Sequence, residues 1–298
     1  MDPKTWLLKH NPSLQGKTVA ITGASGDLGR EICRAVLTLS GSLVLLNRDP
    51  EKTRRLTEAL LAEFPDGQIR FLPLELTDLA SVDRAAGLLA QEPPDILVHN
   101  AGAYKIPRCT CATGLDNVFQ INFFSPYYLT KRLLPALSAR GSKVVVMGSV
   151  AYAYSASDPA DVDFSGRGPC HLVYGNSKRY LMFAFAQLLA DWPRVDFAVA
   201  HPGVSFTNIS NHYPKALYAL IRWPMQVFLP KPEKAVRSMV YALTHPVPRD
   251  CWVGPGFFRV WGEPRVRPLR GCPDWEKLDL HSRAESLYNL VAYGQHNK

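Results

Sequence analysis

Two side chains in the stretch VYGNSK, residues 173–178, could act together on a proton. Tyr174 and Lys178 are four residues apart in a segment with helical spacing, so they share one helix face. A free tyrosine is a weak acid with a pKa of about 10, and a neighbouring ammonium group lowers that pKa because it stabilises the tyrosinate. The pair could therefore deliver a proton to an oxygen atom, as the reduction of a ketone requires.

A glycine-rich turn near the N-terminus could hold phosphate groups. The stretch VAITGASGDLGREI places Gly23, Gly26 and Gly29 between a short apolar run and a helical segment. Glycines in such a turn let the backbone approach a pyrophosphate, which then lies on the free N–H groups at the helix N-terminus. Asp27 is unexpected there, because a carboxylate aimed at the phosphates would repel them. We therefore expect the Asp27 side chain to point away from the dinucleotide.

The end of the second apolar run, LLNRDPEK, indicates which dinucleotide is bound. NAD-binding proteins of this kind carry an acidic residue there, which holds the ribose 2′-OH. Here the position is taken by Asn47 and Arg48, and a guanidinium group offers a planar fork of donors that suits a 2′-phosphate. The sequence therefore favours NADP over NAD. Asp49 is the alternative ribose contact, if the strand runs one or two residues further.

Apolar runs and helical segments alternate along the chain. The apolar runs cover 17–23, 42–48, 68–76, 95–102, 142–149 and 194–203, and the helical segments cover 28–40, 50–64, 78–91, 113–138 and 173–192. The runs are apolar throughout, which is typical of parallel strands buried on both faces. The alternation predicts an α/β fold, a doubly wound parallel sheet of the Rossmann type, with ligands at the carboxyl ends of the strands.

No linker rich in Pro, Gly or Ser divides the chain, so we expect a single domain over 1–298. Its cofactor half would cover about 15–150 and its catalytic and substrate half about 151–298, ending in a C-terminal substrate-side extension. The six cysteines have no C-x-x-C spacing, and we read them as reduced thiols in a cytoplasmic protein without a metal site. The N-terminus has no signal peptide.

The formal net charge of +8 favours anionic partners, such as phosphate-bearing cofactors, acidic membrane surfaces or nucleic acid. The basic residues are spread along the chain and accompany no recognition motif, so we expect no nucleic-acid partner. The charge is therefore consistent with a phosphate-bearing cofactor.

Together these motifs resemble the short-chain dehydrogenase/reductase superfamily. Its usual turn is T-G-x-x-x-G-x-G, whose second glycine would fall on Asp27, whereas the spacing T-G-x-x-G-x-x-G occurs in its extended and divergent branches. Asn122 and Ser149 precede Tyr174 and Lys178 in family order. The insertion between Ser149 and Tyr174 resembles the branch of retinol dehydrogenase and protochlorophyllide reductase, and the resemblance covers most of residues 15–262.

The resemblance implies an NADP(H)-dependent oxidoreductase that interconverts a carbonyl and an alcohol by hydride transfer. Tyr174 would donate the proton, Lys178 would lower its pKa and bind the nicotinamide ribose, and Ser149 would orient the substrate oxygen. Asn122 would hold a water that relays protons from Lys178, and His99 would be structural. The implied cofactor contacts are Gly23, Ser25, Gly26, Asp27, Leu28, Gly29, Asn47, Arg48, Glu75, Leu76, Asn100, Ala101, Gly102, Tyr174, Lys178, Pro202, Gly203, Val204 and Thr207.

The segment after HPGVSFT is expected to form a substrate lid. Its apolar part, 216–229, suits a bulky apolar small molecule such as a steroid, a retinoid or a lipid-like carbonyl or alcohol. The same side chains could instead pack a loop onto the core or lie on a membrane surface as a peripheral contact. The segment is too short to cross a bilayer, which takes about 20 apolar residues.

Two other functions stay open. The glycine spacing also suits an extended-type nucleotide-sugar epimerase. A non-catalytic NADP-binding sensor or scaffold could use the same fold, because a fold does not fix a function. A homo-oligomer is also open, since dimers and tetramers are common in the superfamily, although the insertion could block the usual interface.

Overall fold

The computed structural model describes residues 2–155, 158, 160–166, 169–203, 231–257 and 260–294. The strands of these residues are β1 (Thr18–Thr22), β2 (Ser42–Asn47), β3 (Ile69–Pro73), β4 (Ile96–His99), β5 (Lys143–Met147), β6 (Asp196–Ala200), β7 (Cys251–Phe257) and β8 (Trp261–Pro268). They form one sheet in the order β3-β2-β1-β4-β5-β6-β7-β8. Neighbouring strands from β3 to β7 are parallel, and β8 is antiparallel to β7.

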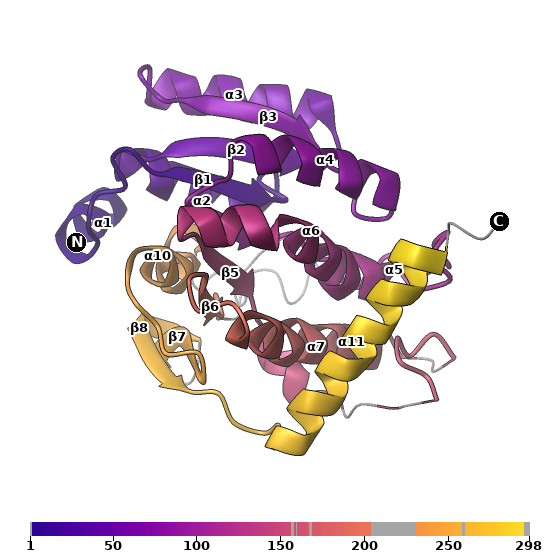
Figure 1. The fold of residues 1–298 in the computed structure, drawn as a ribbon. Helices are drawn as coiled ribbons and strands as arrows, with labels where there is room; N and C mark the ends of the chain where they lie inside the picture. Colours follow the sequence, from indigo (N-terminus) through magenta and orange to yellow (C-terminus); the bar gives the residue numbers. More distant parts are fainter. Residues whose placement is uncertain are drawn as a thin grey trace, which may run out of the picture.

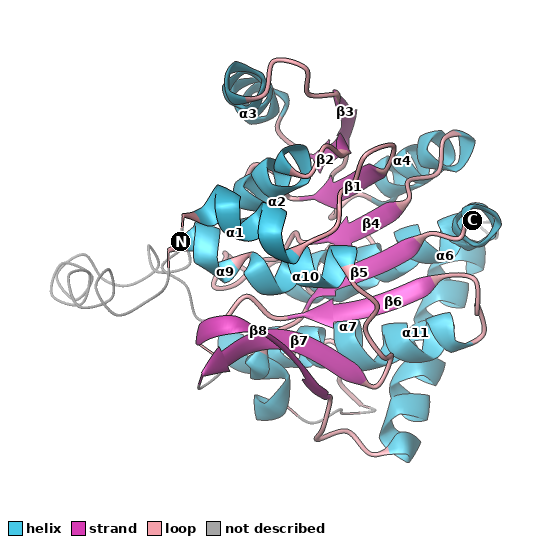
Figure 2. Ribbon diagram, turned by 90° about the vertical axis from the view of Figure 1, so that its left-hand side faces the viewer, coloured by secondary structure: helices cyan, strands magenta, loops and turns pink. Residues whose placement is uncertain are grey.

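Helices cover both faces of the sheet, so the described residues form three layers (Figures 1 and 2). The helices are α1 (Pro3–His10), α2 (Asp27–Thr38), α3 (Pro50–Glu63), α4 (Leu79–Gln91), α5 (Asn117–Phe119), α6 (Ser125–Arg140), α7 (Cys170–Ala190), α9 (Pro232–Ala235), α10 (Arg237–Thr244) and α11 (Asp274–Gly294). Helical turns of other types among the described residues are the π-helix η1 (Gln120–Phe124) and the 3₁₀ helix η2 (Val150–Tyr154). The predicted doubly wound α/β fold is confirmed.

The two hydrophobic cores explain why the strands are apolar throughout. In β5, Val144 and Val146 belong to the core under α4, α6, α7 and α11. The alternate residues Val145 and Met147 belong to the opposite core, which α2, α3 and α10 cover. Because successive strand side chains point to opposite faces, both sets of positions must be apolar.

Three sequence expectations need correction. The third strand was expected to reach residue 76 but ends at Pro73, after which residues 75–78 form a turn closed by the Asp78 N–H on the Glu75 carbonyl. The helix expected over 113–138 begins only at Asn117 and continues to Arg140. Its beginning is interrupted by the π-helix η1, whose wider turn is centred on Asn122.

The β7–β8 hairpin is the third difference, because the sequence predicted no strands after β6. Strand β8 lies at the edge of the sheet and contains Pro264 and Pro268. Proline has no N–H to donate to a neighbouring strand, so an edge strand can carry it. No helix of the residues that the structure describes is long and apolar enough to span a membrane.

Candidate active site

Ser149 and Tyr174 meet beside the carboxyl end of β5. Ser149 follows β5 after one glycine and caps η2, with its Oγ accepting from the Ala151 N–H at 3.2 Å. Tyr174 lies in the first half of α7, and its hydroxyl is close enough to that of Ser149 for Ser149 to lower its pKa. Gly175 makes this contact possible, because a Cβ there would lie 2.6 Å from the Ala151 carbonyl oxygen. The glycine thus lets the first half of α7 lie directly on η2.

The pKa of Tyr174 reflects three neighbours. Burial raises the pKa above its usual value, the nearby Ser149 hydroxyl lowers it, and the nearby Tyr104 hydroxyl raises it. The Tyr104 ring packs against the Tyr174 ring edge to face, with 5.1 Å between the ring centroids. Sequence reasoning missed Tyr104, because only the folded loop after β4 brings it to α7.

Lys178 lies one helical turn after Tyr174, as the spacing predicts, and is buried. Its Nζ donates to the Met147 carbonyl at 2.8 Å and lies 5.7 Å from the centroid of the Tyr174 ring. Burial lowers the pKa of this ammonium group to about 8. The Lys178 amine is therefore directed at the end of β5. In this geometry the group that lowers the pKa of Tyr174 is Ser149, and not Lys178 as the sequence predicts.

The pKa of Lys178 makes stability depend on pH. The folded pKa of about 8 lies below the usual 10.5, so the unfolded chain binds more protons between these two values. The free energy of unfolding should therefore rise with pH across that window, by about 3 kcal/mol in total. We expect Lys178→Met to remove this rise when urea unfolding of the cofactor-free protein is followed from pH 7 to about 10.5.

The matched control for this prediction is Lys52→Met, because the Lys52 side chain is 70% exposed. This variant should follow the pH curve of the wild type. Parallel curves for wild type and Lys178→Met would contradict the prediction, because they would mean that Lys178 has the same pKa in the folded and unfolded chains.

Asn122 connects the loop after β4 to α7. Its Oδ1 accepts from the Ala103 N–H at 2.6 Å, and its Nδ2 donates to the Ala103 carbonyl at 2.9 Å and to Ser177 Oγ at 3.0 Å. A Cβ on Gly102 would lie 3.4 Å from Asn122 Oδ1 and 3.7 Å from Lys178 Nζ. Asn122 and Lys178 therefore both lie next to the loop that follows β4. The role of Asn122 in holding a water stays a prediction.

The glycine turn is tied to the end of β4. Thr22 Oγ1 accepts from the N–H groups of Asn100 and Ala101 at 3.1 and 3.0 Å, and Asn100 Nδ2 donates to the Gly23 carbonyl at 3.0 Å. Gly23 has a φ of +66°, and a Cβ there would lie 2.8 Å from Ala101 Cα. A Cβ on Gly29 would lie 2.3 Å from the Gly23 carbonyl oxygen. Both glycines are thus required by the packing of the chain itself.

Gly26 is different, because no such contact requires it. It is exposed at the N-cap of α2, and among the described residues a Cβ there would meet only the Gly23 carbonyl oxygen, at 3.5 Å. The open side of Gly26 at a helix N-terminus therefore fits a pyrophosphate. Asp27 is the first residue of α2, where the helix dipole favours a negative charge. Ser25 and Leu28 are partly buried in the same turn.

The end of β2 carries the residues expected at the adenosine ribose. Asn47 is buried, its Nδ2 donates to Thr53 Oγ1 at 3.1 Å, and its Oδ1 has no hydrogen-bond partner among the described residues. Arg48 is exposed and lies 3.9 Å from Glu75 Oε2. Asp49 caps α3, with Oδ1 accepting from the Lys52 N–H at 3.0 Å. The Asp49 carboxylate is thus engaged in a helix cap, which leaves Arg48 as the exposed group.

The remaining expected contacts lie along the same edge of the sheet. Glu75 Oε1 accepts from Thr77 Oγ1 at 2.9 Å, and the Leu76 carbonyl accepts from Gln120 Nε2 at 3.1 Å. Pro202 and Gly203 follow β6, and Gly203 has a φ of +81°. Val204, Thr207 and the expected lid over 216–229 lie outside the described residues.

His99 has the structural role that the sequence indicates. It is buried at the end of β4, and its Nε2 lies 2.8 Å from Thr130 Oγ1 in α6. Burial lowers the pKa of its imidazole to about 3, so the ring is neutral at physiological pH.

The insertion after Ser149 is held against the loop that follows β4. Arg108 Nε donates to Asp116 Oδ2 at 2.8 Å, and the Asp116 N–H donates to Asp163 Oδ2 at 2.6 Å. Asn176, two residues after Tyr174, donates to the Val162 carbonyl at 2.7 Å. Sequence reasoning missed these residues, because nothing in their local pattern shows that the two loops meet.

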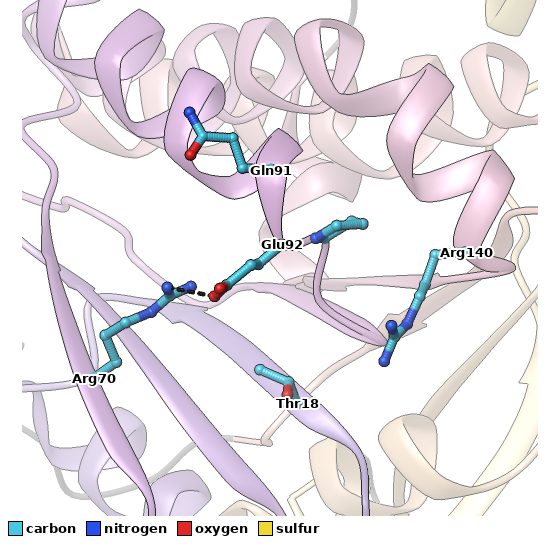
Figure 3. A pocket seen from close by; sticks show the side chains of 6 residues that line it. Thr18, Arg70, Gln91, Glu92 and Arg140 are labelled. Carbon is cyan, nitrogen blue, oxygen red and sulfur yellow. Dashed lines mark hydrogen bonds and ion pairs between the residues drawn. The ribbon is translucent and has the colours of Figure 1, made fainter.

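A pocket at the opposite ends of the strands is no candidate for the same site (Figure 3). It lies beside Thr18, the first residue of β1. Its two guanidinium groups are already paired, Arg70 with Glu92 at 2.6 Å and Arg140 with Asp95 at 3.0 Å. The side chains that the sequence predicts to be catalytic instead gather at the carboxyl ends, where this fold binds its ligands.

A parallel sheet with a glycine turn after β1 and a Ser–Tyr–Lys group beside β5 defines a class, the dinucleotide-binding α/β oxidoreductases. A family model described as short chain dehydrogenase matches residues 17–160. A mouse protein named polyprenol dehydrogenase is 30% identical over 93% of this chain and 84% of its own length. Human retinol dehydrogenase 14 is 28% identical over 78% of this chain and 75% of its own.

Solved structures show the same fold. The crystal structure of an uncharacterized protein from Mycobacterium paratuberculosis has a TM-score of 0.73 at 24% identity and covers 95% of this chain and 96% of its own. An NADPH-dependent 3-quinuclidinone reductase from Rhodotorula rubra has a TM-score of 0.62 at 18% identity, and the match covers 82% of this chain and 88% of the reductase. The chain belongs to the short-chain dehydrogenase/reductase family, whose oxidoreductases act on alcohols and carbonyls with an NAD(P) cofactor.

Proposed function

We propose that this oxidoreductase uses NADP(H) to interconvert a carbonyl and an alcohol on a bulky apolar small molecule. The observation that carries the proposal is that the hydroxyls of Ser149 and Tyr174 lie close together, with buried Lys178 one turn further along α7. We also propose that 1–298 form one domain, whose cofactor half covers about 15–150.

The chemistry of the site follows from these groups. The bound nicotinamide supplies the hydride. Tyr174 donates the proton to the substrate oxygen, while Ser149 hydrogen-bonds the same oxygen and stabilises the charge that develops on it. Lys178, whose pKa is about 8, can lose and regain a proton near neutral pH and so replace the proton that Tyr174 gives up. Asn122 keeps the loop of Ala103 beside this site.

Arg48 supports the choice of NADP. Its side chain is 72% exposed and leans towards Glu75 at the sheet edge, whereas Asp49 is engaged in the cap of α3. A carboxylate that already accepts from a helix N-terminus is a poor ribose ligand, and an exposed guanidinium group suits a phosphate.

Replacing Arg48 with alanine should weaken NADPH binding by about tenfold to a hundredfold, because a hydrogen-bonded ion pair to the 2′-phosphate is lost. NADH binding should change little, since NADH has no such phosphate. Titrations that follow nicotinamide fluorescence measure both affinities. Arg55→Ala is the matched control, because the Arg55 side chain is also 72% exposed and pairs with Glu51 on α3. Equal losses for NADPH and NADH would move the 2′-phosphate contact away from Arg48.

The apolar substrate class rests on the named relatives and on Tyr104. The relatives named polyprenol dehydrogenase and retinol dehydrogenase act, by their names, on long apolar alcohols. In this chain the Tyr104 ring lies against Tyr174 and supplies an aromatic wall next to the reacting oxygen. We propose a cytoplasmic protein, since all six cysteines are free thiols.

The test is a panel of carbonyl compounds with NADPH as the reductant. Faster NADPH consumption with retinoid, steroid or lipid-like carbonyls than with small polar ones would support the proposal. Tight binding of a nucleotide-sugar would favour the epimerase instead, and NADPH binding without turnover of any carbonyl would favour a sensor or scaffold.

A further inference from the structure

Arg179, the residue after Lys178, is a buried charge that the proposed chemistry does not use. Its Nε donates to Glu276 Oε1 at 2.7 Å and its Nη2 to Glu276 Oε2 at 2.6 Å. Glu276 is also buried and lies in the first turn of α11. The bidentate pair thus joins the catalytic helix α7 to the C-terminal helix, which crosses it in Figure 1.

The same guanidinium group reaches two further segments. Nη2 donates to the Gly271 carbonyl at 2.8 Å, and Nη1 donates to the Tyr152 carbonyl at 3.3 Å. Tyr152 lies in η2, the helix that Ser149 caps. Its own hydroxyl donates to the Arg270 carbonyl at 2.8 Å. The chain before α11 and the Arg179 side chain therefore hold η2 from two sides.

Stability alone does not explain this arrangement. A buried ion pair is often no more stabilising than apolar side chains of similar volume, because both charges lose their hydration. An apolar contact between α7 and α11 could dock the terminal helix equally well. It could not donate hydrogen bonds to the Tyr152 carbonyl in η2 and to the Gly271 carbonyl in the chain before α11, and these two bonds tie η2 and that chain to α7.

We propose that Arg179 is a positioning residue: held by Glu276, it fixes η2 on α7 and so keeps Ser149 against Tyr174. The proposal rests on the proposed function, in which Ser149 and Tyr174 contact the substrate oxygen. It makes the C-terminal helix a part of the machinery that aligns the active site, although α11 contributes no group to the reaction.

The test is a double variant, Arg179→Met with Glu276→Leu, in the full chain. Two apolar side chains replace the ion pair, so α11 should stay docked and the melting temperature should stay near that of the wild type. The hydrogen bonds to Tyr152 and Gly271 are lost. Asp274→Asn is the control, because it removes an exposed ion pair with Lys277 in the same first turn of α11.

We expect the double variant to lose about tenfold to a hundredfold in kcat with saturating NADPH, while cofactor affinity is kept. The nearby Ser149 hydroxyl lowers the pKa of Tyr174, so moving Ser149 away should shift the alkaline limb of kcat to higher pH. Amide hydrogen exchange should become faster in 150–154 and stay slow in 274–294. The control should match the wild type in all three measurements.

A double variant with wild-type kcat, pH profile and exchange in 150–154 would overturn the proposal, and Arg179 would then be only a structural anchor. If the double variant fails to fold, Arg179→Lys takes its place, because it keeps the charge beside Glu276 but cannot make all four hydrogen bonds. The same changes in kcat, pH profile and exchange are expected for it, and wild-type values would overturn the proposal. Hydrogen exchange needs no turnover. A wild type that reduces no carbonyl would therefore defeat the proposed function, while exchange in 150–154 would still decide the role of Arg179.

Discussion

Tyr174→Phe is expected to lower kcat/KM for carbonyl reduction by about a hundredfold to ten-thousandfold, which is the usual contribution of a positioned proton donor. The variant keeps the ring that packs against Tyr104 and loses only the hydroxyl that lies near Ser149. NADPH affinity should stay close to that of the wild type. Steady-state kinetics with a carbonyl from the panel, together with a fluorescence titration, measure the two effects separately.

Tyr104→Phe is the matched control for that experiment. It removes a hydroxyl from the neighbouring ring, keeps the edge-to-face packing and takes away a group that raises the pKa of Tyr174. It should therefore retain most of the activity. A Tyr174→Phe enzyme with a near wild-type rate would remove Tyr174 from the mechanism. Equal losses in both variants would mean that both hydroxyls are needed, and Tyr174 could then not be singled out as the proton donor.

The second large effect concerns the glycine turn, where two similar substitutions should behave differently. A Cβ at Gly26 has room in the folded chain, and its φ of −76° suits alanine, so Gly26→Ala should unfold at the wild-type urea concentration. The added methyl group lies where a pyrophosphate would approach the backbone, and NADPH affinity should fall by about tenfold or more. Fluorescence titration measures the NADPH affinity, and urea unfolding measures the stability.

Gly29→Ala is the comparison. Its Cβ would lie 2.3 Å from the Gly23 carbonyl oxygen and 2.8 Å from Ala24 Cα, so the turn must shift. Such overpacking costs about 1–3 kcal/mol, and stability and cofactor binding should fall together. A Gly26→Ala protein that binds NADPH as tightly as the wild type would show that the phosphates do not approach Gly26. That result would also remove the reason to expect that the Asp27 carboxylate points away from a pyrophosphate.

Much of the fold and of the site could be predicted because its signals are local. Strand β5 must be apolar at every position because it lies between two helical layers, and KVVVM shows this directly. Tyr174 and Lys178 share a helix face by spacing alone, and Ser149 follows a strand. Gly29 is required by backbone contacts within a few residues, with Gly23 and Ala24, whereas Gly23 is required by the distant Ala101.

The features that could not be predicted depend on contacts between distant segments. Asn122 forms its hydrogen bonds with Ala103 and Ser177, which no spacing rule connects to it. The ion pair of Arg179 with Glu276 joins residues 97 positions apart, and its charges would look like exposed ones in the sequence. The β7–β8 hairpin was also missed, because prolines within an apolar-poor segment argue against strands unless the strand lies at an edge.

The most direct test of hydride transfer is isotopic. NADPH that carries deuterium at the transferring position would be mixed with the enzyme and an apolar ketone, and the product alcohol examined by mass spectrometry. We expect deuterium on the carbinol carbon with wild-type protein and almost none with Tyr174→Phe. If NADPH binds tightly but transfers no deuterium to any carbonyl of the panel, hydride transfer is ruled out and the protein is a binder of NADP rather than an enzyme.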